Sequence, residues 1–137
     1  MKRKFLIAVS VLFLLALTQH FALAQKSTAA TRVKFARDAT TATVTGRFRG
    51  FKDRTAFVIR VKKGQTLEVN QLDSGSDGSV YLGILSPSGE DESDGEANCN
   101  NHKRVENTTA GDYRIDVTEC MKADAWRGTF RLKFTVK

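Results

Sequence analysis

The chain has 137 residues, of which 22 are Lys or Arg and 15 are Asp or Glu, and its formal net charge is +7. This length is enough for one domain with a single hydrophobic core. Three of the 22 Lys and Arg residues and none of the 15 Asp and Glu residues lie in positions 1–24, so the rest of the chain has a net charge of +4. This charge is too modest for the dense basic stripe of a nucleic-acid binder, so we expect no nucleic-acid partner.

The first 24 residues have the three-part pattern of a secretory signal peptide. Positions 2–4 read Lys-Arg-Lys, an apolar run extends from Phe5 to Leu17, and positions 22–24 read Ala-Leu-Ala. The apolar run is shorter than the roughly 20 residues that a membrane-spanning helix needs. We therefore predict a signal peptide at 1–24, no membrane span, and a soluble mature chain that is periplasmic or secreted.

The chain after the signal peptide divides into a short leader and one domain. Residues 25–31 are small and polar, which predicts a flexible leader followed by a domain over 32–137. Within this domain, apolar residues recur at every second position, the period of half-buried strands. These alternating runs are 33–35, 42–48, 57–61, 67–69, 113–117 and 130–136. The run 80–85 is apolar on both faces, which predicts a central strand.

Turns that contain Gly separate these runs at 50–53, 62–64 and 110–112. No long amphipathic helical pattern interrupts them, and the chain has one Pro. The predicted fold class is therefore all-β: a small antiparallel β-sandwich, jelly-roll-like, with about seven or eight strands.

One polar region, residues 86–110, interrupts the strand pattern and predicts a long loop with a short strand near 104–107. Cys99 lies in this loop, and Cys120 follows the strand predicted at 113–117. Two cysteines in an exported chain predict a disulfide between Cys99 and Cys120. It would close a loop of about 20 residues and contribute roughly 3 kcal/mol through chain entropy.

The sequence offers little for catalysis or metal binding. After the signal peptide the single His is His102, in the polar loop, with no nucleophile motif to pair with. The cysteines lack the spacing of zinc ligands, and the acidic segment 73–79 lacks the spacing of a calcium-binding EF-hand. We expect a protein that is not an enzyme and has no cofactor and no metal site.

Aromatic and basic residues on two turns are the candidates for partner binding. Phe51 and Lys52 lie at the first turn, and Lys122, Trp126 and Arg127 follow Cys120. Trp and Arg are enriched at the energetic centres of protein interfaces. Two alternatives stand for each aromatic residue. Phe51 either enters a partner's pocket or folds back onto the end of the sandwich, and Trp126 either contacts a partner or caps the core.

Several segments, taken in chain order, resemble a known family. Val-Lys-Phe-Ala-Arg at 33–37 leads to Val-Thr-Gly-Arg-Phe-Arg-Gly-Phe at 44–51. The segment 57–69, with Lys-Lys-Gly-Gln, and the segment 110–117, with Gly-Asp-Tyr, come next. This order resembles the periplasmic inhibitors of goose-type (g-type) lysozyme and, more loosely, the bacterial pre-peptidase C-terminal domains. Both groups are small exported β-sandwiches.

The resemblance implies a function as well as a fold. It implies an exported inhibitor of g-type lysozyme that blocks the substrate cleft with loops at one end of the sandwich. Phe51 matches the family's aromatic position, whereas the later loop has Met121 and Ala125 where the family has Arg. Lys122 and Arg127 are the basic residues that remain there. The alternative is a non-catalytic module of the pre-peptidase type that binds carbohydrate or protein of the cell envelope.

Overall fold

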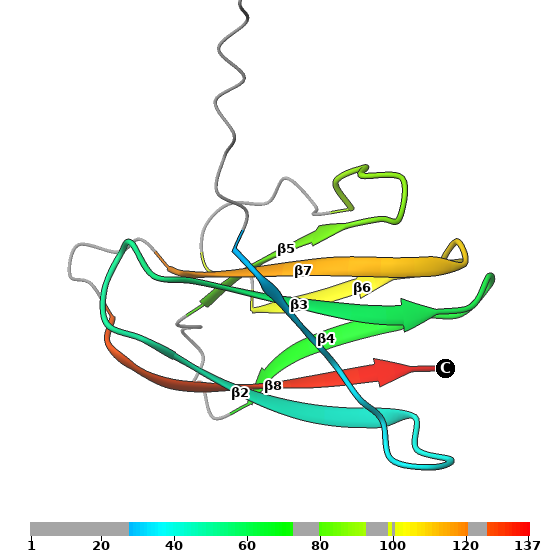
Figure 1. Cartoon of the computed structure of the whole chain (residues 1–137), viewed down its shortest axis with the longest axis horizontal. Helices are drawn as coiled ribbons and strands as arrows, with labels where there is room; N and C mark the ends of the chain where they lie inside the picture. Colours follow the sequence, from blue (N-terminus) through cyan, green and yellow to red (C-terminus); the bar gives the residue numbers. More distant parts are fainter. Residues whose placement is uncertain (1–27, 73–79, 93–98, 100, 121–125) are drawn as a thin grey trace, which may run out of the picture.

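The structure is a computed structural model that describes residues 28–72, 80–92, 99, 101–120 and 126–137. Its eight strands form two four-stranded sheets, with the orders β1-β3-β7-β5 and β2-β8-β4-β6 (Figure 1). The strands are β1 (Ala30–Arg32), β2 (Thr41–Phe48), β3 (Arg54–Val61), β4 (Leu67–Leu72), β5 (Val80–Leu85), β6 (His102–Val105), β7 (Gly111–Glu119) and β8 (Gly128–Val136). The predicted all-β sandwich is confirmed.

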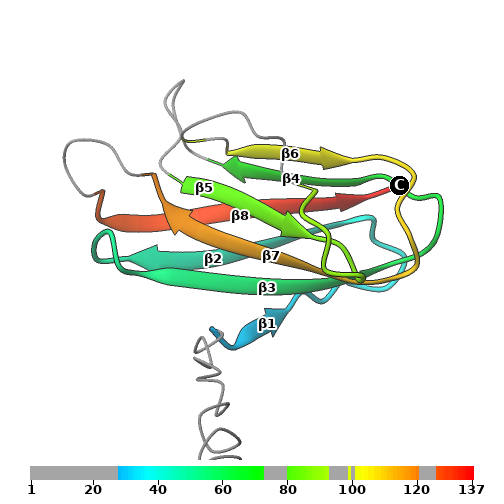
Figure 2. The ribbon, with the colours of Figure 1, turned by 90° about the horizontal axis from the view of Figure 1, so that it is seen from above.

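The two sheets pack face to face around one core (Figure 2). Alternate residues of each strand point inward, as the period of two predicts. The fully buried side chains include Phe48, Ile59, Leu67, Val69, Leu82, Ile84, Tyr113, Ile115, Phe130, Leu132 and Phe134. The predicted signal peptide lies outside the described residues. Within the described part of the chain, no helix is long and apolar enough to cross a membrane.

The first strand lies earlier than the alternation predicts. β1 occupies Ala30–Arg32 and pairs with β3 in parallel, so it begins inside the predicted leader and ends before the predicted strand at 33–35. Backbone pairing at a sheet edge needs no buried side chains, which explains why three exposed residues, Ala30, Thr31 and Arg32, form it. The guanidinium of Arg32 donates two hydrogen bonds to Asp112, at 3.0 and 2.7 Å. This contact holds the pKa of Asp112 below its ordinary value.

The prediction that 80–85 is a central strand is wrong. Among the described strands, β5 pairs with β7 alone and lies at the edge of its sheet. The chain after β5 turns back over this edge, where the N–H of Glu92 donates to the carbonyl of Ile84 at 2.8 Å. A covered edge can tolerate an apolar strand that an open edge would not. The short strand β6 was predicted at 104–107 and lies at His102–Val105.

The predicted disulfide is confirmed between Cys99 and Cys120. Cys120 immediately follows β7 and is buried, with 3% of its surface exposed. The bond therefore ties the segment that precedes β6 to the end of the β7 strand, on the opposite sheet.

Gly46 marks a point of close packing inside the sandwich. A Cβ at Gly46 would lie 2.1 Å from Cζ of Phe130, its partner on β8. Gly46→Ala should displace this buried ring and lower the free energy of unfolding by about 1–3 kcal/mol in chemical denaturation. Gly50→Ala is the matched control, because a Cβ there meets nothing within 4 Å. Equal losses at both positions would contradict the packing argument.

Reduction of Cys99–Cys120 should destabilise the fold. The bond joins residues 21 positions apart, which corresponds to about 3 kcal/mol and a fall in melting temperature of roughly 10 °C. Thermal unfolding with and without reductant measures this difference. A Cys99→Ser, Cys120→Ser double variant should have the melting temperature of the reduced protein, and reductant should not change that temperature. If reductant left the melting temperature of the unmodified protein unchanged, the disulfide would not stabilise the fold as predicted.

Candidate functional site

One end of the sandwich brings together most of the residues that the sequence singled out. β2 ends at Phe48 and β8 begins at Gly128, and these two residues are register partners. The β2–β3 turn and the residues before β8 therefore lie side by side, at the end opposite the C-terminus (Figure 1). We call this region the arginine end. It comprises Arg47, Arg49, Phe51, Lys52, Trp126 and Arg127.

The β2–β3 turn holds Phe51 outward. The carbonyl of Gly50 accepts a hydrogen bond from the N–H of Asp53 at 3.0 Å, and the Asp53 carboxylate accepts one from the N–H of Arg49. Phe51 and Lys52 thus occupy the two central positions of a β-turn. Phe51 is 40% exposed and is the one large hydrophobic residue left exposed in the described part of the chain. It is not among the partly buried hydrophobic residues that pack against the core.

Three arginines surround a shallow hollow beside this turn. Arg47, Arg49 and Arg127 line it together with Phe48 and Gly128, and its volume is about 360 Å³. All three arginines are exposed. Among the described residues, no carboxylate forms an ion pair with any of them. Guanidinium groups bind carboxylates through two parallel hydrogen bonds, so this hollow favours an acidic partner.

Trp126 supports this end from inside. Its backbone N–H donates to Oε1 of Glu119 at 2.7 Å, and its ring stands edge-on to Phe48 with 6.5 Å between ring centroids. A Cβ at Gly128 would lie 2.7 Å from Cζ2 of Trp126, so the ring rests on that glycine. Trp126 is half-buried and packs against the core, so it fixes the position of the backbone from which Arg127 extends. Glu119 is buried, and its Oε2 has no hydrogen-bond partner among the described residues.

The structure brings together four of the five predicted binding residues: Phe51, Lys52, Trp126 and Arg127. The fifth, Lys122, lies outside the described residues. Sequence analysis missed Arg47 and Arg49. Their signal was an Arg-x-Arg spacing in a strand, because residues two apart on a strand share a face.

Other ionisable groups lie on β4 and β6, away from the arginine end. Nε2 of His102, on β6, lies 3.2 Å from Oε1 of Glu68. A hydrogen bond from Asn70, and to a lesser degree the contact with His102, lowers the pKa of Glu68. Burial lowers the pKa of Lys103, whose Nζ lies 6.0 Å from the centre of the Tyr81 ring. Nowhere in the described ranges do three or more His, Cys, Asp or Glu residues form a group able to hold a metal ion.

Comparisons with known proteins give matches at the level of structure. No family profile and no curated protein sequence matches the chain. The crystal structure of Aeromonas hydrophila PliG, a periplasmic inhibitor of g-type lysozyme, superposes with a TM-score of 0.61 at 21% identity, over 80% of this chain and 96% of that chain. Salmonella Typhimurium PliG superposes with a TM-score of 0.57 at 17% identity, over 80% of this chain and 100% of that chain.

A second group has the same architecture. The pre-peptidase C-terminal domain of a Bacillus anthracis collagenase superposes with a TM-score of 0.52 at 18% identity, over 80% of this chain and 96% of that chain. Structural matches at sequence identities this low show a shared fold and do not show a shared activity. The chain therefore has the β-sandwich fold that PliG lysozyme inhibitors share with pre-peptidase C-terminal domains, as the sequence resemblance implied.

Proposed function

We propose that this chain is an exported inhibitor of g-type lysozyme and that its arginine end covers the substrate cleft of the enzyme. The observation that carries the proposal is the outward Phe51 beside three arginines that no described carboxylate neutralises. The fold shared with PliG supports it. The expected signal peptide at 1–24 would deliver the protein to the periplasm or the exterior, where it would meet such an enzyme.

The chemistry of the partner matches the charge of this surface. Glycoside hydrolases cleave their substrates with Asp and Glu residues that line the cleft. An arginine placed there would grip a catalytic carboxylate with two hydrogen bonds. Phe51 would fill an apolar subsite as an anchor, and Lys52 and Lys122 would add positive charge at the rim. Occupation of the cleft needs no reaction, so the inhibitor need not be an enzyme.

The hydrogen bonds of the turn lower the cost of binding. Both Asp53 contacts fix the backbone around Phe51 before any partner arrives, and the bond from Trp126 to Glu119 does the same for the approach to Arg127. A surface that is already ordered loses less conformational entropy when it binds. We infer that the arginine end docks as a rigid surface.

The second candidate function is a non-catalytic module that binds cell-envelope carbohydrate or protein. The likeness to the B. anthracis pre-peptidase domain favours it. The same arginine end would serve this function. The two functions differ in whether binding stops a lysozyme from working.

A lytic assay separates the two functions. The purified protein is added to goose-, chicken- and invertebrate-type lysozymes acting on peptidoglycan. The proposal expects inhibition of the goose type alone. Inhibition of no class would overturn it and leave the binding module as the explanation.

Phe51→Ala and Arg127→Ala should each weaken the inhibition by tenfold or more, because truncation of an interface anchor costs about 1.4 kcal/mol or above. The inhibition constant measures this loss. Arg37→Ala is the matched control for Arg127, since Arg37 is an exposed arginine in the connection from β1 to β2. Inhibition should also fall as salt rises, because salt screens exposed charges. Equal potency of Arg127→Ala and Arg37→Ala would argue against the proposed surface.

Gly128→Ala tests whether Trp126 positions this surface. The added Cβ would lie 2.7 Å from the Trp126 ring, so the ring should move outward into solvent. The chain has one Trp, so its fluorescence reports on this site alone. We expect a red-shifted emission together with weaker inhibition. Gly50→Ala, at the same end, should change neither, and an unshifted spectrum for Gly128→Ala would refute the supporting role.

A further inference from the structure

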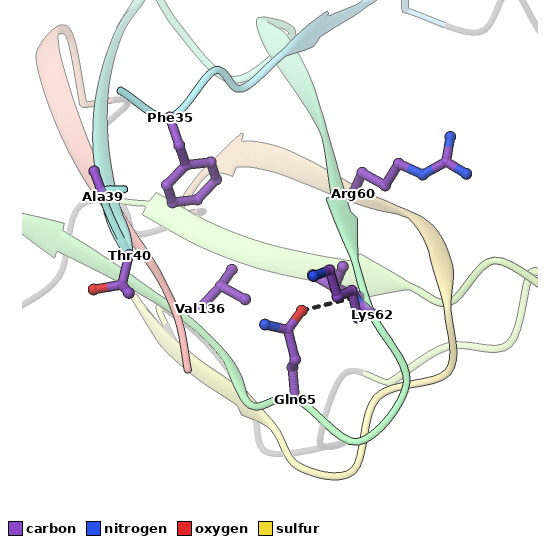
Figure 3. A pocket seen from close by; sticks show the side chains of 8 residues that line it. Phe35, Ala39, Thr40, Arg60, Lys62, Gln65 and Val136 are labelled. Carbon is purple, nitrogen blue, oxygen red and sulfur yellow. Dashed lines mark hydrogen bonds between the residues drawn. The ribbon is translucent and has the colours of Figure 1, made fainter. Parts of the chain in front are cut away.

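The opposite end of the sandwich holds a second hollow, with a volume of about 410 Å³. Its walls come from three segments: the connection from β1 to β2, the β3–β4 turn, and the end of β8 (Figure 3). The ring of Phe35 points into the space, and Val61 and Val136 also line it. This volume lies within the range of small-molecule sites, which combine apolar walls with a few fixed polar groups.

Backbone hydrogen bonds hold these walls in place. The N–H of Val33 donates to the carbonyl of Val58 at 2.9 Å, which anchors the chain that leads to Phe35. The N–H of Val136 donates to the carbonyl of Thr40 at 2.8 Å, which joins the same connection to β8. The hollow is therefore formed before any ligand enters.

Gln65 supplies an oriented hydrogen-bond donor. Its Oε1 accepts a hydrogen bond from the N–H of Lys62 at 2.7 Å, and Figure 3 shows its amide nitrogen on the opposite side, towards Val136. The turn itself is fixed by Thr108, which is buried and whose hydroxyl donates to the carbonyls of Lys62 and Gln65, at 2.7 and 3.0 Å. Because Oε1 is occupied, the amide presents a donor rather than an acceptor to a ligand.

The charge around this hollow is positive. Arg60 and Lys62 are among its lining residues, and none of those residues is acidic. The nearby Asp112 is already held by two hydrogen bonds from Arg32. Arg60 adds a weaker attraction to the same carboxylate, and both effects lower its pKa. Figure 3 shows the Arg60 side chain pointing away from the space, so Lys62 is the cation nearest to a ligand there. An aromatic wall, an amide donor and this cation together favour a ligand with an apolar body and one carboxylate.

We propose that this hollow, which we call the Phe35 pocket, binds a small carboxylate whose apolar ring or chain packs on Phe35 and Val136. The amide of Gln65 donates to the carboxylate, and Lys62 neutralises it. This site lies at the other end of the strands from the arginine end, so it does not depend on the function proposed above.

Phenylacetate and its neutral analogue phenylacetamide are the probes, added to the ¹⁵N-labelled full chain and followed by NMR. Phenylacetate should bind with a Kd of the order of 1 mM, as expected for so small a ligand, and should shift the amides of Phe35, Val61, Gln65 and Val136. Phenylacetamide should bind at least about fivefold more weakly. No saturation, equal binding of both probes, or shifts confined to Arg47, Arg49 and Arg127 would each overturn the proposal.

Two variants test the polar contacts without emptying the pocket. Gln65→Glu keeps an oxygen for the N–H of Lys62 but replaces the donor with a negative charge, so phenylacetate binding should be lost. Lys62→Gln should weaken binding by about fivefold. Lys63→Gln is the matched control, since Lys63 lies in the same turn outside the pocket lining. Melting curves show that each variant folds, and full binding by Gln65→Glu would refute the assignment.

Discussion

The packing of aromatic rings onto glycines where β2 and β8 pair is the constraint on which the rest of this structure depends. Gly46 leaves room for Phe130, and Gly128 leaves room for Trp126. Phe48 lies between these rings, with its centroid 4.8 Å from that of Phe130. Any side chain at either glycine would push a ring out of the core. The strand pair thus determines both how closely the aromatic residues pack and where the chain leaves the sandwich.

That pairing also explains why the candidate site lies at a strand end. Along β2 the side chains alternate, so Phe48 points inward while Arg47 and Arg49 point outward. The register partner of Phe48 is Gly128, which brings Arg127 to the same place. The sheet therefore brings Arg127 beside Arg47 and Arg49, which lie far from it in the sequence, and none of the three forms an ion pair with a described carboxylate. The packing beneath these arginines holds them close together despite their mutual repulsion, and an acidic partner would relieve that repulsion.

The sequence predicted the fold well because alternation is a local property of each strand. It predicted the disulfide for a different reason, because two cysteines in an exported chain leave one pairing within the chain. The predictions of the position of β1 and of a central β5 were wrong, because sheet order depends on contacts between distant segments. The sequence identified Phe51 as a candidate but could not decide whether its side chain is exposed, which depends on how the turn between Gly50 and Asp53 meets the rest of the sandwich. It gave no sign of the Phe35 pocket, whose walls are far apart in the chain.

The two ends of the sandwich are both positive, yet their shapes suit different partners. Phe51 stands exposed on a turn, where a protein cleft could enclose the ring. Phe35 lines a hollow that a small molecule could fill. Positive charge favours an acidic partner at both ends. The shape of each end then favours a protein at the arginine end and a small molecule in the Phe35 pocket. The same sheet framework can therefore hold two sites that do not compete, because the length of the strands keeps them apart.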